Sequence, residues 1–142
     1  MSEPPAPETE APGIDQHLAR VRRQLDRLSP HRAHAEAAAG ARLVDTRPRL
    51  RREDEGGIPG ALVIERNHLE WRLDPSSEGA LPEADDRTLR WIVFCDEGYA
   101  SSLAAASLRT VGVSRATDLI GGFRAWRAAG LPVLPPTGRP GA

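Results

Sequence analysis

Cys95, the single cysteine of the chain, is the residue best suited to chemistry. It ends the apolar run 89–95, which predicts a buried strand, and it precedes a loop that contains Gly98. Ser101 or Ser102 then begins a predicted helix. A loop and a helix N-terminus can direct several N–H groups at the sulfur, which favours the nucleophilic thiolate over the thiol. A nucleophilic cysteine is therefore our hypothesis, and an inert buried cysteine is the alternative.

Composition excludes several other chemistries. One cysteine cannot form an intramolecular disulfide, and four scattered histidines do not suggest a metal site. The chain has no lysine, which excludes Schiff-base chemistry and the lysine of a phosphate-binding P-loop. A net charge of −1 gives no electrostatic reason to bind nucleic acid or an anionic membrane. We therefore expect neither of these partners, and no metal.

Two further features of the sequence bear on the cellular compartment. The N-terminus lacks the basic and apolar segments of a secretory signal. The uncharged run 99–108 is too short and too polar to span a bilayer. These features predict a cytoplasmic protein.

Short apolar strands alternate with helices along the chain. This order predicts an α/β fold with a mostly parallel central sheet and helices on both faces. The expected strands are 42–47, 61–64, 89–95 and 116–120. The expected helices are 14–28, 30–39, 68–73, 101–111 and 123–129. Ligands of such sheets bind at the carboxyl ends of strands, where Cys95 stands.

We divide the chain into three parts. Residues 1–13 are rich in Pro, Glu and Ala and are expected to be disordered. Residues 14–134 are expected to form one domain, which begins with the helix 14–28 packed on its own domain. Residues 135–142 are expected to form a flexible tail.

The segment Cys95-Asp96-Glu97-Gly98-Tyr99-Ala100-Ser101 resembles the active-site loop of the rhodanese family. Other segments resemble that family in the same order along the chain: Leu43 to Arg47, Gly57 to Ala61, Asp118 to Phe123 with Trp126, and Ala129 to Val133. The resemblance covers roughly residues 30–134. It implies a rhodanese-like, three-layer α/β/α domain of the single-domain bacterial type.

The chemistry that the resemblance implies is sulfur transfer. Cys95 attacks a donor, either thiosulfate or a related persulfide or thiol donor, and becomes a persulfide whose terminal sulfur is held by the loop amides. A thiophilic acceptor such as cyanide or a thiol then takes that sulfur. No metal or organic cofactor is implied. Because the chain has no second cysteine, the sulfur must leave to an outside acceptor, and an acceptor protein is left open.

The loop departs from the pattern of the family at two points. Asp96 and Glu97 are acidic, whereas typical thiosulfate-using members carry at least one basic residue in the loop. We therefore expect these carboxylates to repel thiosulfate and make it a mediocre donor. Ala100 stands where some members have Arg, Ser or Thr, which leaves Ser101 and Ser102 as the hydroxyl candidates.

Four more residues are candidates for supporting the site. Asp45 and Arg47 either form an ion pair that supports the loop from the neighbouring strand or form an ordinary strand-end pair. Arg66 and Arg72 follow the second predicted strand. They either face the cleft and attract an anionic donor or lie on the surface as solvated arginines.

Two other functions are weighed against sulfur transfer. A phosphatase of a related fold uses an arginine six positions after its cysteine, where this chain has Ser101. No arginine lies between Cys95 and Arg109, which argues against phosphatase or arsenate reductase activity. A rhodanese-like module that binds or senses sulfur without turnover is the other alternative, although Cys95 and Gly98 are both retained.

Overall fold

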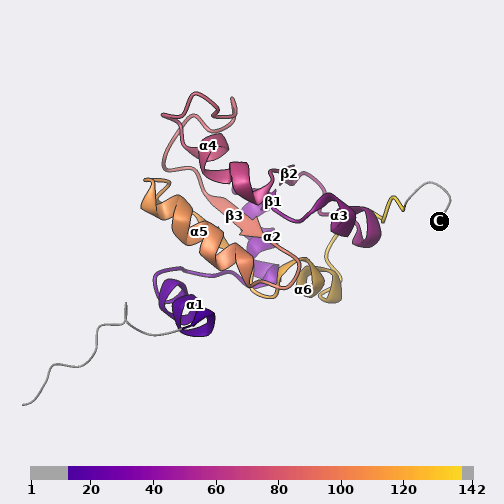
Figure 1. The fold of residues 1–142 in the computed structure, drawn as a ribbon. Helices are drawn as coiled ribbons and strands as arrows, with labels where there is room; N and C mark the ends of the chain where they lie inside the picture. The colour runs from indigo at the N-terminus through magenta and orange to yellow at the C-terminus, as the bar shows by residue number, and fades with distance from the viewer. Residues whose placement is uncertain (1–12, 139–142) are drawn as a thin grey trace, which may run out of the picture.

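A parallel four-stranded sheet lies at the centre of the computed structural model, which describes residues 13–138 (Figure 1). The strand order is β2-β1-β3-β4, and every pairing is parallel. The strands are β1 (Arg42–Asp45), β2 (Leu62–Val63), β3 (Trp91–Phe94) and β4 (Thr117–Asp118). All four residues of β3 are buried. The expected α/β fold with a parallel sheet is confirmed.

Helices cover both faces of the sheet, because successive side chains of a strand point to opposite faces. Trp91 and Val93 pack into one core cluster, and Ile92 and Phe94 pack into the other. The first cluster is completed by α4 (Leu69–Leu73) and α5 (Ala100–Thr110). The second is completed by α2 (Pro30–Ala38) and α6 (Gly122–Ala128). The predicted layers of helices on the two faces are therefore present.

The first helix is shorter than expected. The sequence predicts a helix over 14–28, but α1 (Ile14–Arg22) ends six residues earlier. Leu28 instead forms a parallel bridge with Leu119 at the sheet edge. The Leu28 N–H donates to the Asp118 carbonyl, and the Ile120 N–H donates to the Leu28 carbonyl. A helix cannot continue through a residue whose N–H and carbonyl are both bonded to another strand.

A helix replaces the charged loop that 49–57 predicts. α3 (Arg49–Glu55) buries no residue, so it lacks the apolar periodicity from which a helix is recognised. An ion pair between Arg49 and Glu53, 2.8 Å long, joins successive turns. Further along the chain, Arg66–His68 form a short 3-10 helix, η2, that leads into α4 (Leu69–Leu73), where the sequence predicts one helix over 68–73.

The two chain ends are described only in part. Of the expected disordered segment 1–13, only Gly13 lies within the described residues, and residues 139–142 of the expected C-terminal tail lie outside them. Leu134 forms an antiparallel bridge with Gly57, and the Gly138 N–H donates to the Glu53 carbonyl. Between residues 13 and 138, the helices are all too short or too polar to cross a bilayer.

Candidate functional site

Cys95 directly follows β3, at the carboxyl edge of the sheet. Its Sγ accepts a hydrogen bond from the Gly98 N–H at 3.1 Å and lies 3.4 Å from Ser101 Oγ. The residue is partly exposed, so a small molecule can reach the sulfur. Helix α5 begins at Ala100, and the first amides of a helix carry partial positive charge. Cys95 therefore combines access with donors that favour an anionic sulfur.

Glycine is required at position 98 for two reasons. Its φ is +92°, a conformation that residues with a Cβ rarely adopt. A Cβ there would also lie 2.7 Å from the Gly121 nitrogen. On the other side of this contact, a Cβ at Gly122 would lie 2.6 Å from the Cys95 carbonyl oxygen. The backbones of the Cys95 loop and the Gly121-Gly122 turn are thus so close that neither Gly98 nor Gly122 has room for a Cβ.

A buried polar cluster lies next to the sulfur, and sequence reasoning missed its central member, Asp118. Ser101 Oγ donates to Asp118 Oδ2 at 2.9 Å, and Ser102 Oγ donates to the same oxygen at 2.8 Å. All three residues are fully buried. Ser101 therefore stands between the sulfur and a carboxylate. Its hydroxyl can accept a hydrogen bond from the thiol or turn its hydrogen toward a sulfur anion.

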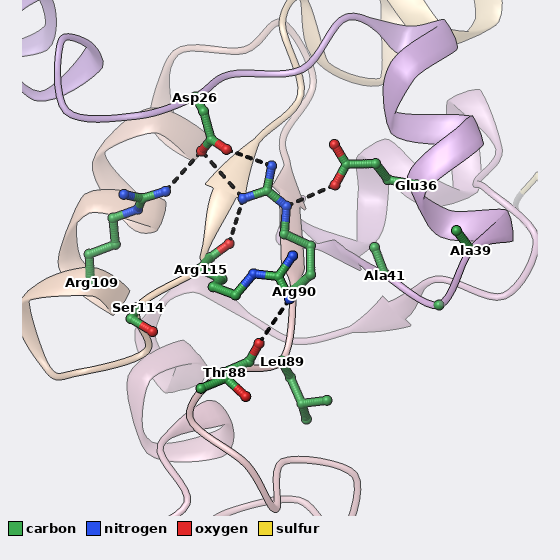
Figure 2. A pocket seen from close by; sticks show the side chains of 11 residues that line it. Asp26, Glu36, Ala39, Ala41, Thr88, Leu89, Arg90, Arg109, Ser114 and Arg115 are labelled. Atoms are coloured by element: carbon green, nitrogen blue, oxygen red, sulfur yellow. Dashed lines mark hydrogen bonds and ion pairs between the residues drawn. The ribbon is translucent and has the colours of Figure 1, made fainter.

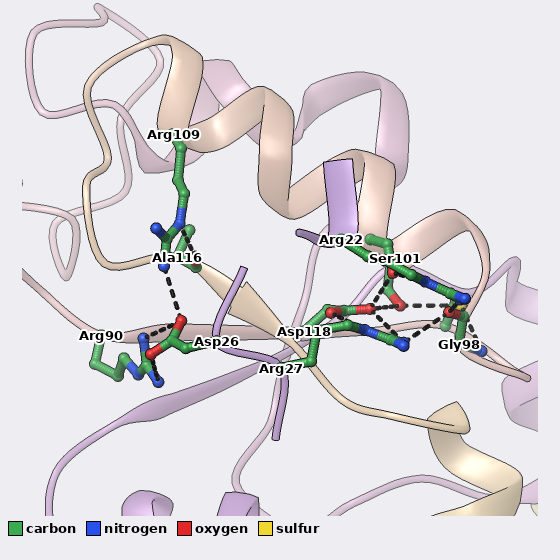
Figure 3. A network of polar contacts seen from close by, with 11 residues as sticks. Arg22, Asp26, Arg27, Arg90, Gly98, Ser101, Arg109, Ala116 and Asp118 are labelled. Carbon is green, nitrogen blue, oxygen red and sulfur yellow. Dashed lines mark hydrogen bonds and ion pairs between the residues drawn. The ribbon is translucent and has the colours of Figure 1, made fainter. Parts of the chain in front are cut away.

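Two arginines that precede α2 reach this cluster, and one of them, Arg27, provides the charge that the buried carboxylate needs. Arg27 binds Asp118 in a bidentate manner, with Nε–Oδ1 at 2.8 Å and Nη2–Oδ2 at 3.1 Å. The Arg27 Nη2 also donates to the Gly98 carbonyl at 3.1 Å, and the Arg22 Nη2 donates to it at 2.7 Å. Figure 3 shows both side chains meeting at Gly98. The Arg22 Nε donates to Ser102 Oγ at 3.1 Å.

The acidic loop residues face a third arginine. Arg124 Nε lies 2.8 Å from Asp96 Oδ2, and Arg124 Nη1 lies 3.7 Å from Glu97 Oε1. Burial raises the pKa of Asp96, but hydrogen bonds with Glu55 and Arg124 outweigh it and hold that pKa below its ordinary value. The hydrogen bond with Asp96 raises the pKa of Glu55. Arg124 thus offsets part of the negative charge that the sequence places in the loop.

The ion pair expected between Asp45 and Arg47 is present and buried. Arg47 Nε and Nη2 bind the two carboxylate oxygens at 3.0 and 2.8 Å. The Arg47 guanidinium also lies 4.1 Å from the centre of the Phe123 ring, and the Phe123 N–H donates to the Cys95 carbonyl at 2.9 Å. The pair therefore reaches the cysteine loop through α6.

The structure does not bring Arg66 and Arg72 into hydrogen-bonding contact with the loop. Arg66 pairs with Glu70 at 2.9 Å, and Arg72 Nη1 donates to the Gly79 carbonyl at 3.2 Å. Arginines from other elements contact the loop instead. One signal could have identified them: a carboxylate in a strand predicted to be buried needs a cationic partner.

One hydrogen-bond donor faces the Cys95 sulfur directly, the Gly98 N–H. The Ser101 and Ser102 hydroxyls donate to Asp118, and the Arg22 guanidinium donates to the Gly98 carbonyl. Within residues 13–138, no group of three or more His, Cys, Asp or Glu side chains is placed to hold a metal ion. The charged species that this arrangement favours are the thiolate of Cys95 and the anion of a Cys95 persulfide.

Comparisons with known proteins find similarity to rhodanese-like and sulfurtransferase proteins. The family model described as "Rhodanese-like domain" matches residues 29–129. The chain is 34% identical over 104 residues to "Thiosulfate sulfurtransferase GlpE" of Stutzerimonas stutzeri, a match that covers 71% of this chain and 84% of that protein. It is 38% identical over 63 residues to the uncharacterized protein slr1261 of Synechocystis, covering 44% of this chain and only 32% of that protein.

A solved structure is similar over almost the whole chain. It is a protein of unknown function from Rhodopseudomonas palustris, RPA3614, whose description adds "Possible Tyrosine Phosphatase". The TM-score is 0.78 at 31% sequence identity, and the match covers 90% of this chain and 98% of the other.

Proposed function

Because the chain belongs to the rhodanese-like domain family, we propose that it is a sulfurtransferase in which Cys95 carries the sulfur as a persulfide. The observation that carries the proposal is the Cys95 Sγ at the end of β3, 3.1 Å from the Gly98 nitrogen, in a residue that is partly exposed. The relatives' names support sulfur transfer in general. The donor, the acceptor and the cytoplasmic location expected from the sequence are part of this proposal.

The first half-reaction loads the sulfur. The Cys95 thiolate attacks the outer sulfur of a donor such as thiosulfate, and a new S–S bond forms. The donor's own S–S bond breaks, and sulfite leaves with the bonding electrons. The negative charge moves to the terminal sulfur of the persulfide. The Gly98 N–H and the Ser101 hydroxyl are the groups beside Cys95 that can donate hydrogen bonds to a sulfur anion.

The second half-reaction unloads it. An acceptor such as cyanide or a thiol attacks the terminal sulfur, and Cys95 leaves as a thiolate. Because Cys95 is the single cysteine of the chain, the acceptor is an outside molecule, either small or a protein. A related persulfide donor would load the cysteine by the same displacement, with the donor's own thiolate as the leaving group.

Phosphatase activity, which the description of RPA3614 raises for that protein, is not our proposal. Ser101 occupies the position at which the phosphatase loop needs an arginine. Its hydroxyl is bonded to the Asp118 carboxylate, so this side chain offers no cationic fork for a phosphoryl group. The non-catalytic alternative, a module that binds or senses sulfur, would use the same Cys95 without turnover.

Mass spectrometry of the intact chain tests the proposal. Treatment with thiosulfate should add one sulfur atom to Cys95, and later addition of cyanide should remove it as thiocyanate over repeated cycles. Cys95→Ser should keep the fold and show neither event. Sulfur loading without turnover would indicate a sensing module. Failure to load from both thiosulfate and a persulfide donor would reject the proposal, and Cys95-dependent hydrolysis of an aryl phosphate would favour phosphatase activity.

A further inference from the structure

Residues that precede the family match complete the surroundings of Cys95. The match begins at residue 29, whereas Arg22 and Arg27 reach the Gly98 carbonyl from the segment before it. We propose that Arg22 and Arg27 are positioning residues of the Cys95 site, which hold Gly98 so that its N–H faces the sulfur. The expected effect on turnover rests on the proposed function, whereas the expected effect on the reactivity of the Cys95 sulfur does not.

Gly98 is held from opposite sides. Its N–H donates to Cys95 Sγ, and its carbonyl oxygen accepts hydrogen bonds from both guanidinium groups, at 2.7 Å from Arg22 and 3.1 Å from Arg27. A carbonyl oxygen has two lone pairs, so both are used. The N–H and the carbonyl belong to adjacent peptide units that meet at the Gly98 Cα, so two charge-assisted hydrogen bonds to the carbonyl hold one of these units in place. This restricts how far the backbone at Gly98 can turn its N–H from the sulfur.

The same arginines fix the start of helix α5. Arg27 binds Asp118, and Asp118 accepts hydrogen bonds from both Ser101 and Ser102 in the first turn of the helix. Arg22 adds a hydrogen bond to Ser102 Oγ. Arg27 thus pairs with the buried carboxylate, and Arg22 adds a second guanidinium group that contacts Ser102 and the Gly98 carbonyl. Arg124 meets the loop's own acidic residues separately.

The segment that carries these arginines is itself anchored. Leu18 of α1 is buried, and Asp26 forms ion pairs of 2.8 Å with both Arg90 and Arg109. In Figure 3 the Asp26 side chain points away from the Cys95 loop, toward Arg90 and Arg109, whereas the Arg27 side chain points toward Gly98. A fixed backbone between them lets Arg22 and Arg27 act as rigid supports rather than as solvated surface charges.

Alkylation of Cys95 by iodoacetamide tests the proposal without any sulfur donor. The reaction is unambiguous because the chain has one cysteine. Arg22→Gln should leave the circular dichroism spectrum native, slow alkylation near neutral pH by about tenfold, as loss of a charge-assisted hydrogen bond implies, and move the pH profile upward. Arg32→Gln is the matched control, since Arg32 is exposed on α2 and loses the same charge. Its profile should match the wild type.

A second variant covers the other arginine. Arg27→Gln alone would leave Asp118 buried and unpaired, so it is combined with Asp118→Asn to remove both charges. This double variant should also shift the alkylation profile upward, and Arg27→Lys should restore only part of the rate because it lacks the bidentate fork. Wild-type profiles in Arg22→Gln and in the double variant would overturn the proposal, as would equal shifts in Arg22→Gln and Arg32→Gln. A shift in alkylation without sulfur transfer by the wild type would reject the proposed function and keep the positioning role.

Discussion

The two ends of strand β3 carry arginine clusters of opposite character. Arg90 immediately precedes the strand and lines a pocket with Asp26, Glu36 and Arg109 (Figure 2). Arg90 pairs with Glu36 at 2.9 Å and with Asp26 at 2.8 Å, and Arg109 pairs with the same aspartate. Cys95 immediately follows the strand. There, Arg22 and Arg27 both donate to a backbone carbonyl, and one carboxylate, Asp118, meets Arg27.

The difference lies in how completely the charges are matched. Around Arg90, two carboxylates face two guanidinium groups, so the cluster is closed and contributes mainly to stability. Around Cys95, two guanidinium groups accompany one buried carboxylate, and the Gly98 N–H is directed at the sulfur of the proposed nucleophile. Ligands of parallel sheets bind at the carboxyl ends of their strands, which agrees with chemistry at the Cys95 end. The following changes should separate stability at one end from chemistry at the other.

The largest effect is expected from Gly98→Val. The new Cβ would lie 2.7 Å from the Gly121 nitrogen, and the residue would be held at φ +92°. Backbone strain of this kind costs about 1–3 kcal/mol, which corresponds to a loss of sulfur-transfer rate of up to about 100-fold if it falls on the loop. Cyanide-dependent thiocyanate formation measures it. Full activity with native circular dichroism would show that the loop geometry is not required.

Arg90→Met should affect stability and leave the chemistry intact. It leaves Glu36 and part of Asp26 without their partner, at a cost of about 1–3 kcal/mol. Burial raises the pKa of Asp26, but the hydrogen bond and charge of Arg90, together with a backbone hydrogen bond and the charge of Arg109, outweigh it and lower that pKa. Asp26 therefore stabilises the fold above its ordinary pKa, and this contribution is lost as the pH falls through the lowered value. Urea unfolding should show less of this acid-dependent loss in the variant, while the alkylation rate of Cys95 stays within about twofold of the wild type because Arg109 still holds Asp26.

Arg124→Gln should show what the acidic loop does to an anionic donor. The sequence predicts that Asp96 and Glu97 repel thiosulfate, and the structure adds an arginine that faces both. Removing it should lower kcat/KM for thiosulfate by about threefold at low salt, and the loss should shrink as salt rises. Asp96→Arg and Glu97→Lys should act in the opposite direction. If kcat/KM is insensitive to all three changes, these side chains do not influence the donor.

Glu55→Gln should have the smallest effect, confined to pH dependence. The raised pKa of Glu55 means that its contribution to stability is complete below the pKa of the unfolded chain and is lost as pH rises through the folded value. Asp96, whose pKa is lowered, contributes above its unfolded pKa and loses this as the pH falls. Glutamine does not titrate, so the decline of Tm from mildly acidic to neutral pH should flatten, by less than about 1 kcal/mol in unfolding free energy. An unchanged dependence of Tm on pH would contradict the raised pKa of Glu55.

Much of the scaffold could be predicted from local patterns. The alternation of apolar runs and helical segments predicted the α/β fold, and the apolar run that ends at Cys95 predicted the central strand. The boundaries were less accurate because tertiary contacts set them. α1 ends at Arg22 since Leu28 bonds to the sheet edge, and α3 forms without an apolar face that a sequence pattern could reveal.

The sequence by itself determined that a cysteine stands at the end of a buried strand and that a glycine follows three residues later, because both facts are local. Only the tertiary structure decided which charges surround them. Arg27 and Asp118 are 91 residues apart in the chain, and Arg22 and Gly98 are 76 apart. A guanidinium group pairs with whichever carboxylate or carbonyl the folded backbone brings within reach, and sequence spacing gives no measure of that distance.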